Sequence, residues 1–216
     1  MDWSGTITRM TSEFDIPKTN PLLIVISGPS GSGKDTIMQK MKERGMPFQF
    51  VVTATTRPKR ENEIDGKDYL FVSKEEFTRM IKKDELLEHA IVYGDYKGIP
   101  KDQVRQALAS GKNAVLRIDV QGAKTIRKLV RGALMIFITT ANEEELERRL
   151  RSRKTETEES LALRITNARK EFQQLDIFDY VVVNSDSHLD ETVDIIHSII
   201  EAEHHLVNQR KVSLDG

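Results

Sequence analysis

The sequence of 216 residues contains no cysteine. This absence excludes disulfide bonds, thiolate metal sites and cysteine nucleophiles, and it fits a protein of a reducing compartment. No apolar run approaches the roughly 18 residues that a membrane-spanning helix needs. The N-terminus also lacks the charged and then apolar pattern of a secretory signal. We therefore expect a soluble intracellular protein without a membrane partner.

The sequence has almost no net charge either, because 33 lysine and arginine residues balance 34 aspartate and glutamate residues. Proteins dedicated to nucleic acids or to membrane surfaces usually carry a clear excess of positive charge. We therefore expect no nucleic-acid partner. Any site for an anion must be local.

Short apolar runs alternate with helical patterns from about residue 21 onward, after a polar, aperiodic extension over residues 1–20. Such alternation predicts an α/β fold with a parallel sheet covered by helices on both faces. The predicted strands are Leu22–Ser27, Ala114–Ile118, Leu134–Thr139 and Tyr180–Val183. The predicted helices are Lys34–Arg44, Lys101–Ser110, Gly122–Val130, Glu143–Arg151 behind the N-cap Asn142, and a closing helix from His188 to about Asn208.

Two stretches interrupt this alternation. Residues from about 49 to 98 carry strand-like pieces around one helix, whose start is marked by Ser73 with Glu76 three residues later, a capping box. This stretch predicts an inserted α+β lobe. Residues 152–160 are polar and charged and lie between two helices, which predicts a short lid. The strand-like pieces of the lobe are Phe50–Thr53, Tyr69–Val72 and Leu86–Tyr93.

A glycine-rich loop with a lysine follows the first predicted strand directly. Gly28, Gly33 and Lys34 match the pattern of a glycine, four residues and then Gly-Lys, in which backbone N–H groups surround phosphate oxygens and the lysine bridges the outer phosphates. The helix that follows directs its positive N-terminus at the same anion. The position between a strand and a helix is the one that phosphate binding requires, so the sequence predicts a nucleotide site at residues Gly28, Pro29, Ser30, Gly31, Ser32, Gly33, Lys34, Asp35 and Thr36.

Asp35 departs from this pattern, because a serine or threonine hydroxyl that contacts Mg²⁺ normally follows the lysine. A carboxylate can hold Mg²⁺ directly or through water. The carboxylate of Asp35 is also simply favourable at the start of a helix. The sequence leaves both interpretations open.

Several further motifs follow in a fixed order. They are Thr53-Ala-Thr-Thr-Arg57-Pro-Lys-Arg60, the run Gly66-Lys-Asp68-Tyr69, Glu88, the run Ile118-Asp119-Val-Gln121-Gly122, and Arg153-Lys-Thr155. With the glycine-rich loop they resemble guanylate kinases over about residues 21–207. The resemblance implies a P-loop NTPase core at residues 21–48 and 99–216, including a lid at about 150–162, and a GMP-binding lobe at residues 49–98.

The resemblance also implies roles for individual residues. Arg57, Arg60 and Tyr69 would hold the phosphate of the acceptor nucleotide, since arginine binds phosphate oxygens in a bidentate manner. Glu88 and Asp119 would read guanine, because a carboxylate accepts hydrogen bonds from both N1–H and the 2-amino group. Thr53 and Gln121 belong to the same GMP-binding set, and Asp119 is a further candidate for Mg²⁺ through water.

Arginines near the lid complete the implied site. Arg149, Arg153 and Arg164 lie on or beside the two helices that flank the lid, so that closure would direct them at the transferring phosphoryl group. Charge stabilisation of this kind, together with exclusion of water, is what phosphoryl transfer needs. With Lys34 and Arg57, these arginines form the predicted catalytic set.

Two positions depart from the family. Lys97-Gly98-Ile99 stands where a tyrosine, a glycine and a hydroxyl residue are usual, so a phosphate contact and a hydroxyl near the base are both missing. Arg117 stands where an acidic residue is common, and it is a candidate to offset the charge of Asp35. The combination is similar to guanylate kinases of plant organelles and related bacteria, which implies a plastid or mitochondrial location, with the cytoplasm as the alternative.

The resemblance implies transfer of the γ-phosphoryl group of ATP to GMP, and to dGMP, by a monomer that uses Mg²⁺. Two alternatives stay open. An inactive relative would serve as a phosphopeptide-binding module, although the retained Lys34 argues against this. A kinase with relaxed base choice would follow from the missing hydroxyl at Ile99.

Overall fold

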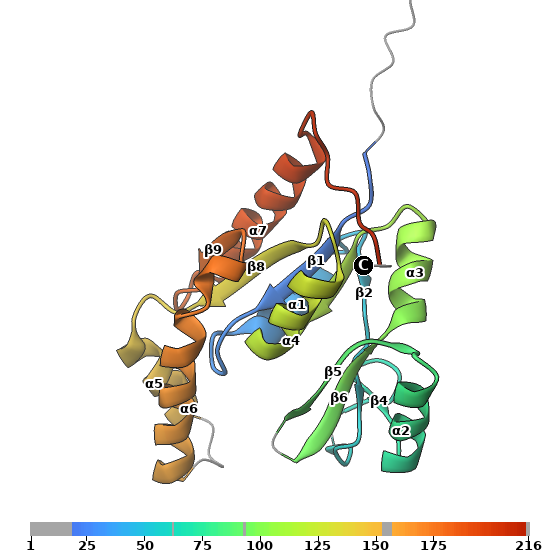
Figure 1. Cartoon of the computed structure of the whole chain (residues 1–216). Coiled ribbons are helices and arrows are strands. Elements are labelled where there is room, and N and C mark those ends of the chain that lie inside the picture. The colour runs from blue at the N-terminus through green and yellow to red at the C-terminus, as the bar shows by residue number, and fades with distance from the viewer. Residues whose placement is uncertain (1–18, 62, 93, 153–156, 215–216) are drawn as a thin grey trace, which may run out of the picture.

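The computed structural model describes residues 19–61, 63–92, 94–152 and 157–214 (Figure 1). Its main body is a five-stranded parallel sheet in the order β2-β7-β1-β8-β9. The strands are β1 (Leu23–Ser27), β2 (Gln49–Phe50), β7 (Ala114–Arg117), β8 (Leu134–Thr139) and β9 (Tyr180–Val183). The predicted α/β fold with a parallel sheet is confirmed.

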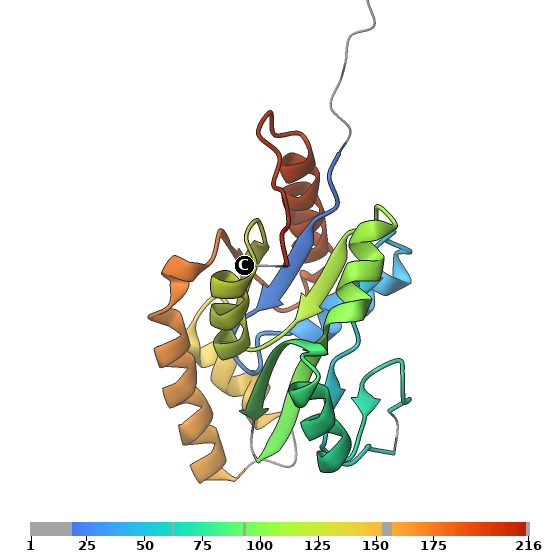
Figure 2. The ribbon, with the colours of Figure 1, turned by 45° about the vertical axis from the view of Figure 1, so that its right-hand side comes forward.

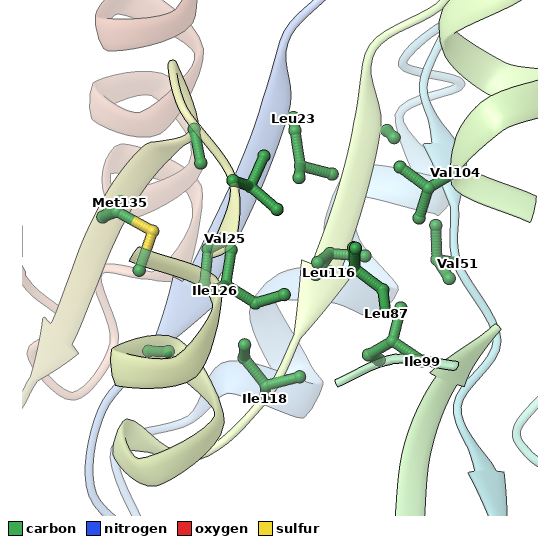
Figure 3. Packing of buried hydrophobic residues seen from close by; sticks show 14 of the residues in the cluster. Leu23, Val25, Val51, Leu87, Ile99, Val104, Leu116, Ile118, Ile126 and Met135 are labelled. Carbon is green, nitrogen blue, oxygen red and sulfur yellow. The ribbon is translucent and has the colours of Figure 1, made fainter. Parts of the chain in front are cut away.

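Central position in the sheet explains the apolar sequence of β1, in which every residue is buried. Parallel strands covered on both faces need apolar side chains on both faces. Leu23 and Val25 point to one face, where Val104 of α3 (Lys101–Ala109) and Ile126 of α4 (Val120–Leu129) pack, and Figure 3 shows this cluster from close by. Ile24 and Ile26 point to the other face, against α1 (Lys34–Glu43) and α7 (Leu189–His204).

A second sheet forms the inserted lobe, in the order β4-β3-β6-β5. Its strands are β3 (Ala54–Thr55), β4 (Leu70–Phe71), β5 (Leu86–Val92) and β6 (Asp95–Pro100), and β5 and β6 pair as an antiparallel hairpin. The helix α2 (Lys74–Lys82) covers this sheet with Phe77 and Met80. Its N-cap is the predicted Ser73, whose hydroxyl accepts a hydrogen bond from the Glu76 backbone N–H at 3.1 Å.

The lobe begins and ends a few residues later than the sequence predicts. Gln49–Phe50 pairs with β7 and therefore belongs to the five-stranded sheet, whereas the sequence assigned both residues to the lobe and Phe50 to a lobe strand Phe50–Thr53. The strand β6 was not predicted, and it continues the lobe sheet to Pro100. Pairing with distant strands decides both assignments, and local sequence does not contain that information.

Two helices, α5 (Glu143–Arg151) and α6 (Glu158–Phe172), pack on each other through Leu146, Leu150 and Leu161. In Figure 1 they lie at the lower left, across from the lobe at the lower right, and in Figure 2 α6 again lies at the lower left and the lobe at the lower right. The centre of the predicted lid, residues 153–156, lies outside the described residues, as does Arg153. A short 3-10 helix, η1 (Leu175–Ile177), leads from α6 towards β9.

Most boundaries in the core agree with the sequence to within two residues, and Asn142 caps α5 as predicted, accepting from the Glu145 N–H at 2.8 Å. The start of α4 differs, because Asp119 is its N-cap and accepts from the Gly122 N–H at 2.8 Å. The helix therefore begins at Val120 and not at Gly122. Within the described ranges, no helix has the length and apolar content that crossing a bilayer requires.

Candidate active site

A cleft of about 1110 Å³ opens between the glycine-rich loop, the lobe and α6. Most residues singled out from the sequence line it. They are Gly28, Ser30, Gly31, Gly33, Lys34, Asp35, Thr36, Thr53, Arg57, Arg60, Tyr69, Glu88, Asp119, Gln121 and Arg164. Of the predicted residues that the structure describes, Pro29, Ser32 and Arg149 are not among those that line it. The fold therefore brings residues that lie up to 136 positions apart in the sequence, from Gly28 to Arg164, into one site.

The glycine-rich loop needs its glycines for steric reasons. Gly28 has φ +134°, and a Cβ atom there would lie 2.0 Å from the Ile138 carbonyl oxygen of β8. At Gly33, with φ +90°, a Cβ would lie 2.2 Å from Asn184 Nδ2. Lys34 Nζ donates hydrogen bonds to the carbonyl oxygens of Gly28 at 2.6 Å and Pro29 at 2.8 Å. The ammonium group is thus held at the mouth of the loop, where it can reach phosphate oxygens.

Residues from the C-terminal third hold this loop from behind. Asn184, just after β9, donates from Nδ2 to the Ser32 carbonyl at 2.8 Å, and Arg149 Nη1 donates to the same oxygen at 3.4 Å. Arg149 also donates to Glu145 Oε1 at 2.5 Å and to the Asn184 carbonyl at 2.7 Å. The sequence predicts that Arg149 faces the cleft with the other arginines. In the structure Arg149 does not line the cleft and instead donates a hydrogen bond to the backbone of the loop.

The helix α6 contributes a polar stripe to the cleft. Arg164 Nη1 donates to Ser30 Oγ at 2.8 Å, so this predicted arginine does contact the loop. Asn167 and Glu171 follow it on the same helical face, and Lys170 also lines the cleft. Sequence reasoning missed these three residues. Their signal was present, since polar residues at positions 164, 167 and 171 recur with helical spacing beside the apolar Leu161, Ile165 and Ala168.

Glu171 is notable among them because its Oε2 atom is buried and has no hydrogen-bond partner among the described residues. Burial raises the pKa of this carboxyl above its usual range, while the charge of Lys34 lowers it and that of Asp119 raises it. Glu171 and Lys34 line the same cleft, close enough for the ammonium charge to act on this carboxyl.

The lobe wall of the cleft is organised around the ring of Tyr69. The cations of Arg57, Lys97 and Arg117 lie 5.3 Å, 6.0 Å and 5.2 Å from its centroid. Together with Glu63 these residues are called the Tyr69 cluster below. Burial raises the pKa of the Tyr69 hydroxyl and lowers that of the Lys97 ammonium. Three cations so close together repel one another, which favours an anionic ligand between them.

Glu63 balances part of this positive charge. Its Oε1 lies 2.6 Å from Arg57 Nη2, and its Oε2 accepts from the Arg60 backbone N–H at 2.8 Å. The hydrogen bond from Arg57 lowers the pKa of the Glu63 carboxyl and raises the pKa of the Arg57 guanidinium. Arg57 therefore lines the cleft with its guanidinium held in place by Glu63, a carboxylate six residues further along the chain.

Glu88 lies deeper, on β5, and is only 6% exposed. Burial, and secondly the charge of Asp119, raise its pKa to about 7. A Cβ atom on Gly122 would lie 3.1 Å from Glu88 Cδ, so the glycine at the start of α4 makes room for this carboxyl. Asp119 uses its Oδ1 to cap α4. The two predicted base readers thus share one end of the cleft.

Asp35 forms an ion pair with Arg117, and the Arg117 Nη2 donates to the Tyr69 hydroxyl at 2.7 Å. The helix-start interpretation of Asp35 is compatible with its place in the first turn of α1. The ion pair adds a contact that the sequence suggested only as charge compensation. Burial lowers the pKa of Arg117, although an arginine stays protonated near neutral pH.

Ile99 does not face the cleft. It is fully buried and packs beside Leu87 and Val51, as Figure 3 shows. The neighbouring Lys97 and Gly98 do line the cleft. Ile99 is therefore a core residue. Where the family usually has a hydroxyl residue, this chain has an apolar side chain that packs in the core.

A metal site made by protein side chains alone is not present in the part of the chain that the structure describes, where no three His, Cys, Asp or Glu residues gather. Mg²⁺ bound through nucleotide phosphates needs only one or two carboxylates from the protein. Asp119 and Glu171 line the cleft and would be the carboxylates to supply such oxygens, and the unpartnered Glu171 Oε2 fits such a role. Asp35 fits less well because its carboxylate is paired with Arg117.

Comparison with known proteins gives consistent matches over nearly the whole chain. The family model described as guanylate kinase matches residues 20–203. Guanylate kinase 2, chloroplastic/mitochondrial, of Oryza sativa subsp. japonica is 50% identical over 208 residues, which cover 96% of this chain and 73% of that protein. Guanylate kinase of Clostridium tetani (strain Massachusetts / E88) is 46% identical over 193 residues, 89% of this chain and 91% of that protein.

A solved structure agrees with these sequences. The crystal structure of guanylate kinase from Anaplasma phagocytophilum superimposes with a TM-score of 0.73 at 31% sequence identity. The superposition covers 89% of this chain and 91% of that one.

Proposed function

The chain belongs to the guanylate kinase family and is an ATP:GMP phosphotransferase, and we propose that the cleft described above is where it transfers the γ-phosphoryl group. The products are ADP and GDP. One observation supports the assignment of the site: the glycine-rich loop with Lys34 and the Tyr69 cluster with Glu88 line a single cleft.

In this proposal ATP binds with its phosphates in the glycine-rich loop. Lys34 reaches the outer phosphates from the loop mouth, and Arg164 approaches them from α6, where it already contacts Ser30. Thr36, one residue beyond Asp35, lines the cleft on the same side. Arg149 supports the loop from behind, so its contribution is to hold the backbone in shape.

GMP binds on the lobe side. Arg57, Arg60 and Tyr69 hold its phosphate, while Glu88 accepts hydrogen bonds from guanine with the help of Asp119. Thr53 and Gln121, the other members of the GMP-binding set, line the same cleft. Adenine lacks the paired donors that a carboxylate would bind here, which accounts for the base preference.

The acceptor phosphate is already anionic, so the transfer needs no catalytic base. What remains is to bring two negatively charged groups into line and to neutralise the charge that they share. Lys34, Arg57 and Arg164 supply positive charge around that point. Mg²⁺, held by ATP with Asp119 and Glu171, would supply further charge neutralisation. The predicted Arg153 belongs to this set but lies outside the described residues.

An acceptor panel tests the proposal. ADP release is measured with ATP and each of GMP, dGMP, AMP, CMP and UMP, using Lys34→Met as the inactive control. We expect turnover with GMP and dGMP, little with the others, and a kcat at least about 10²-fold lower for Lys34→Met, the scale of a lost charge contact in the transition state. Equal rates for all acceptors would contradict the base-reading role of Glu88, and near-normal rates for Lys34→Met would contradict the loop assignment.

We further propose that the enzyme acts in a plastid or mitochondrion, because the relative named chloroplastic/mitochondrial is 50% identical to this chain. Fractionation of source cells with an antibody against the chain tests this location. Detection only in the cytosolic fraction would contradict it.

We also propose that the enzyme acts as a monomer, because one chain supplies both walls of the cleft. Light scattering during size-exclusion chromatography should give a mass near 24.7 kDa. A mass twice as large that persists on dilution would contradict the proposal.

A further inference from the structure

Arg117 contacts residues on both sides of the cleft, Asp35 beside the glycine-rich loop and Tyr69 in the lobe. It ends β7, beside Ile26 of the central strand, at the edge of the sheet from which the glycine-rich loop departs. One guanidinium nitrogen pairs with Asp35 in the first turn of α1. Another donates to the hydroxyl of Tyr69 in the lobe at 2.7 Å. Its side chain is 23% exposed, so most of it is enclosed by these contacts.

We propose that Arg117 is a positioning residue that couples the two substrate sites, with Tyr69 on the GMP side and Asp35 on the ATP side. The inference rests on the proposed function of the cleft, and it gives Arg117 a role that the sequence motifs of the family do not assign to this position.

The direction of the hydrogen bond gives the first argument. Arginine has only donors, so in this contact the Tyr69 oxygen must accept. The single proton of the hydroxyl is then left to donate elsewhere, and the cleft is where a phosphate oxygen would receive it. A donor bond from a cation also polarises the hydroxyl and strengthens the bond that it gives in turn. Arg117 thus fixes both the direction and the strength of the Tyr69 contact to GMP.

The charge of Asp35 gives the second argument. An acidic residue directly after Lys34 places negative charge where negative phosphates must bind, which opposes binding. Arg117 cancels this charge through the ion pair. Asp35 in turn fixes the guanidinium beside the loop, so the loop side and the lobe are joined through three side chains, Asp35, Arg117 and Tyr69.

Substitution of Arg117 by methionine tests the proposal, with Arg105→Met as the matched control. Arg105 lies on α3 in a surface pair with Asp102, and its side chain is 53% exposed. We expect Arg117→Met to raise the KM and Kd for GMP roughly tenfold, the scale of one hydrogen bond to a charged group. The KM for ATP should rise as well, because Asp35 becomes unbalanced. Arg105→Met should change none of these values.

Further variants separate positioning from a merely structural effect. Tyr69→Phe should raise the KM for GMP, and the double variant Tyr69→Phe with Arg117→Met should be no worse than the more damaging single variant, because both remove the same chain of bonds. Asp35→Asn combined with Arg117→Met should restore the KM for ATP but not that for GMP. The same double variant covers the case in which an unbalanced Asp35 prevents Arg117→Met from folding.

Calorimetric titration of GMP into each folded variant supplies a readout apart from turnover. Unchanged GMP affinity in Arg117→Met would overturn the proposal, as would additive effects of Tyr69→Phe and Arg117→Met. A wild-type chain that binds neither substrate would instead contradict the function assigned to the cleft, so the two failures are distinguishable.

Discussion

The glycine-rich loop and the Tyr69 cluster line the same cleft, and they are shaped by different forces. Steric contacts of the backbone shape the loop, since a side chain at Gly28 would collide with the Ile138 carbonyl. Contacts among charged side chains shape the Tyr69 cluster, where Arg57 is held by Glu63 and Arg117 by Asp35.

This difference implies different behaviour before substrate binds. The loop has its final shape without ligand, because close packing leaves its backbone few alternatives. The cations of the Tyr69 cluster are partly neutralised by carboxylates, and an incoming phosphate must compete with these. We therefore expect substitutions of the loop glycines to act mainly on stability and those in the cluster to act mainly on affinity.

The largest expected effect comes from Gly28→Ala. The new Cβ would meet the Ile138 oxygen at 2.0 Å, and φ of +134° is unfavourable for alanine, so the free energy of unfolding should fall by about 4 kcal/mol or more. Gly45→Ala is the control, because φ there is +65° and nothing lies within 4 Å of the new atom. That change should cost about 1–2 kcal/mol. Urea unfolding measures the free energy of unfolding of both variants. Equal losses in Gly28→Ala and Gly45→Ala would contradict the steric account of the loop.

Glu88 should give the next largest effect, in stability and in affinity together. Its pKa of about 7 in the folded protein exceeds the ordinary value of 4.5. The folded state therefore keeps a proton that the unfolded state loses between pH 4.5 and 7, so stability falls as pH rises through this range. The cost at pH 8 should be about 3 kcal/mol, and Glu88→Gln should remove this pH dependence.

The function of Glu88 has the opposite dependence on pH, since only the carboxylate accepts both hydrogen bonds from guanine. We expect kcat/KM for GMP to rise between pH 6 and 8 in the wild type and to lose this component in Glu88→Gln, with KM raised roughly 10- to 100-fold. Urea unfolding at several pH values checks the prediction for stability, and steady-state kinetics at the same pH values checks the prediction for kcat/KM. If Glu88→Gln is less stable than the wild type at pH 8 and has a normal KM for GMP, both the expected effect of Glu88 on stability and its role in binding guanine are contradicted.

The smallest effect concerns Glu63, whose Oε1 lies 2.6 Å from Arg57. Glu63→Gln removes the charge that balances Arg57, which should lower the free energy of unfolding by about 1 kcal/mol without ligand. Saturating GMP should reduce this difference, because its phosphate replaces the lost charge. Thermal unfolding with and without GMP measures the change. A difference that stays constant would show that phosphate and Glu63 do not compete for Arg57.

The same contrast explains what the sequence could predict. The loop is a continuous segment whose glycines and lysine have fixed spacing, and the neighbouring strand and helix were found from their apolar patterns. The guanylate kinase family and its fold could also be predicted, since several motifs occur in order. Leu134–Thr139 and Tyr180–Val183 even have the predicted bounds.

Features that depend on distant pairing could not be predicted. The sequence offered no means to see that Gln49–Phe50 joins the core sheet, or that Asp95–Pro100 is a strand. The position of Arg149 behind the loop and the polar stripe of α6 also required the assembled fold. The ion pair between Asp35 and Arg117 was anticipated only as compensation of charge, without its link to Tyr69.

Asn184 holds the glycine-rich loop from a position 152 residues further along the chain than Ser32. A chain growing from its N-terminus therefore carries the whole loop motif long before it carries the groups that shape it. We therefore expect the loop to gain its full support only after Arg149 and Asn184 have been synthesised, and nucleotide binding to follow that step. A truncated chain that ends before β9 would retain the motif and lack the support for the site.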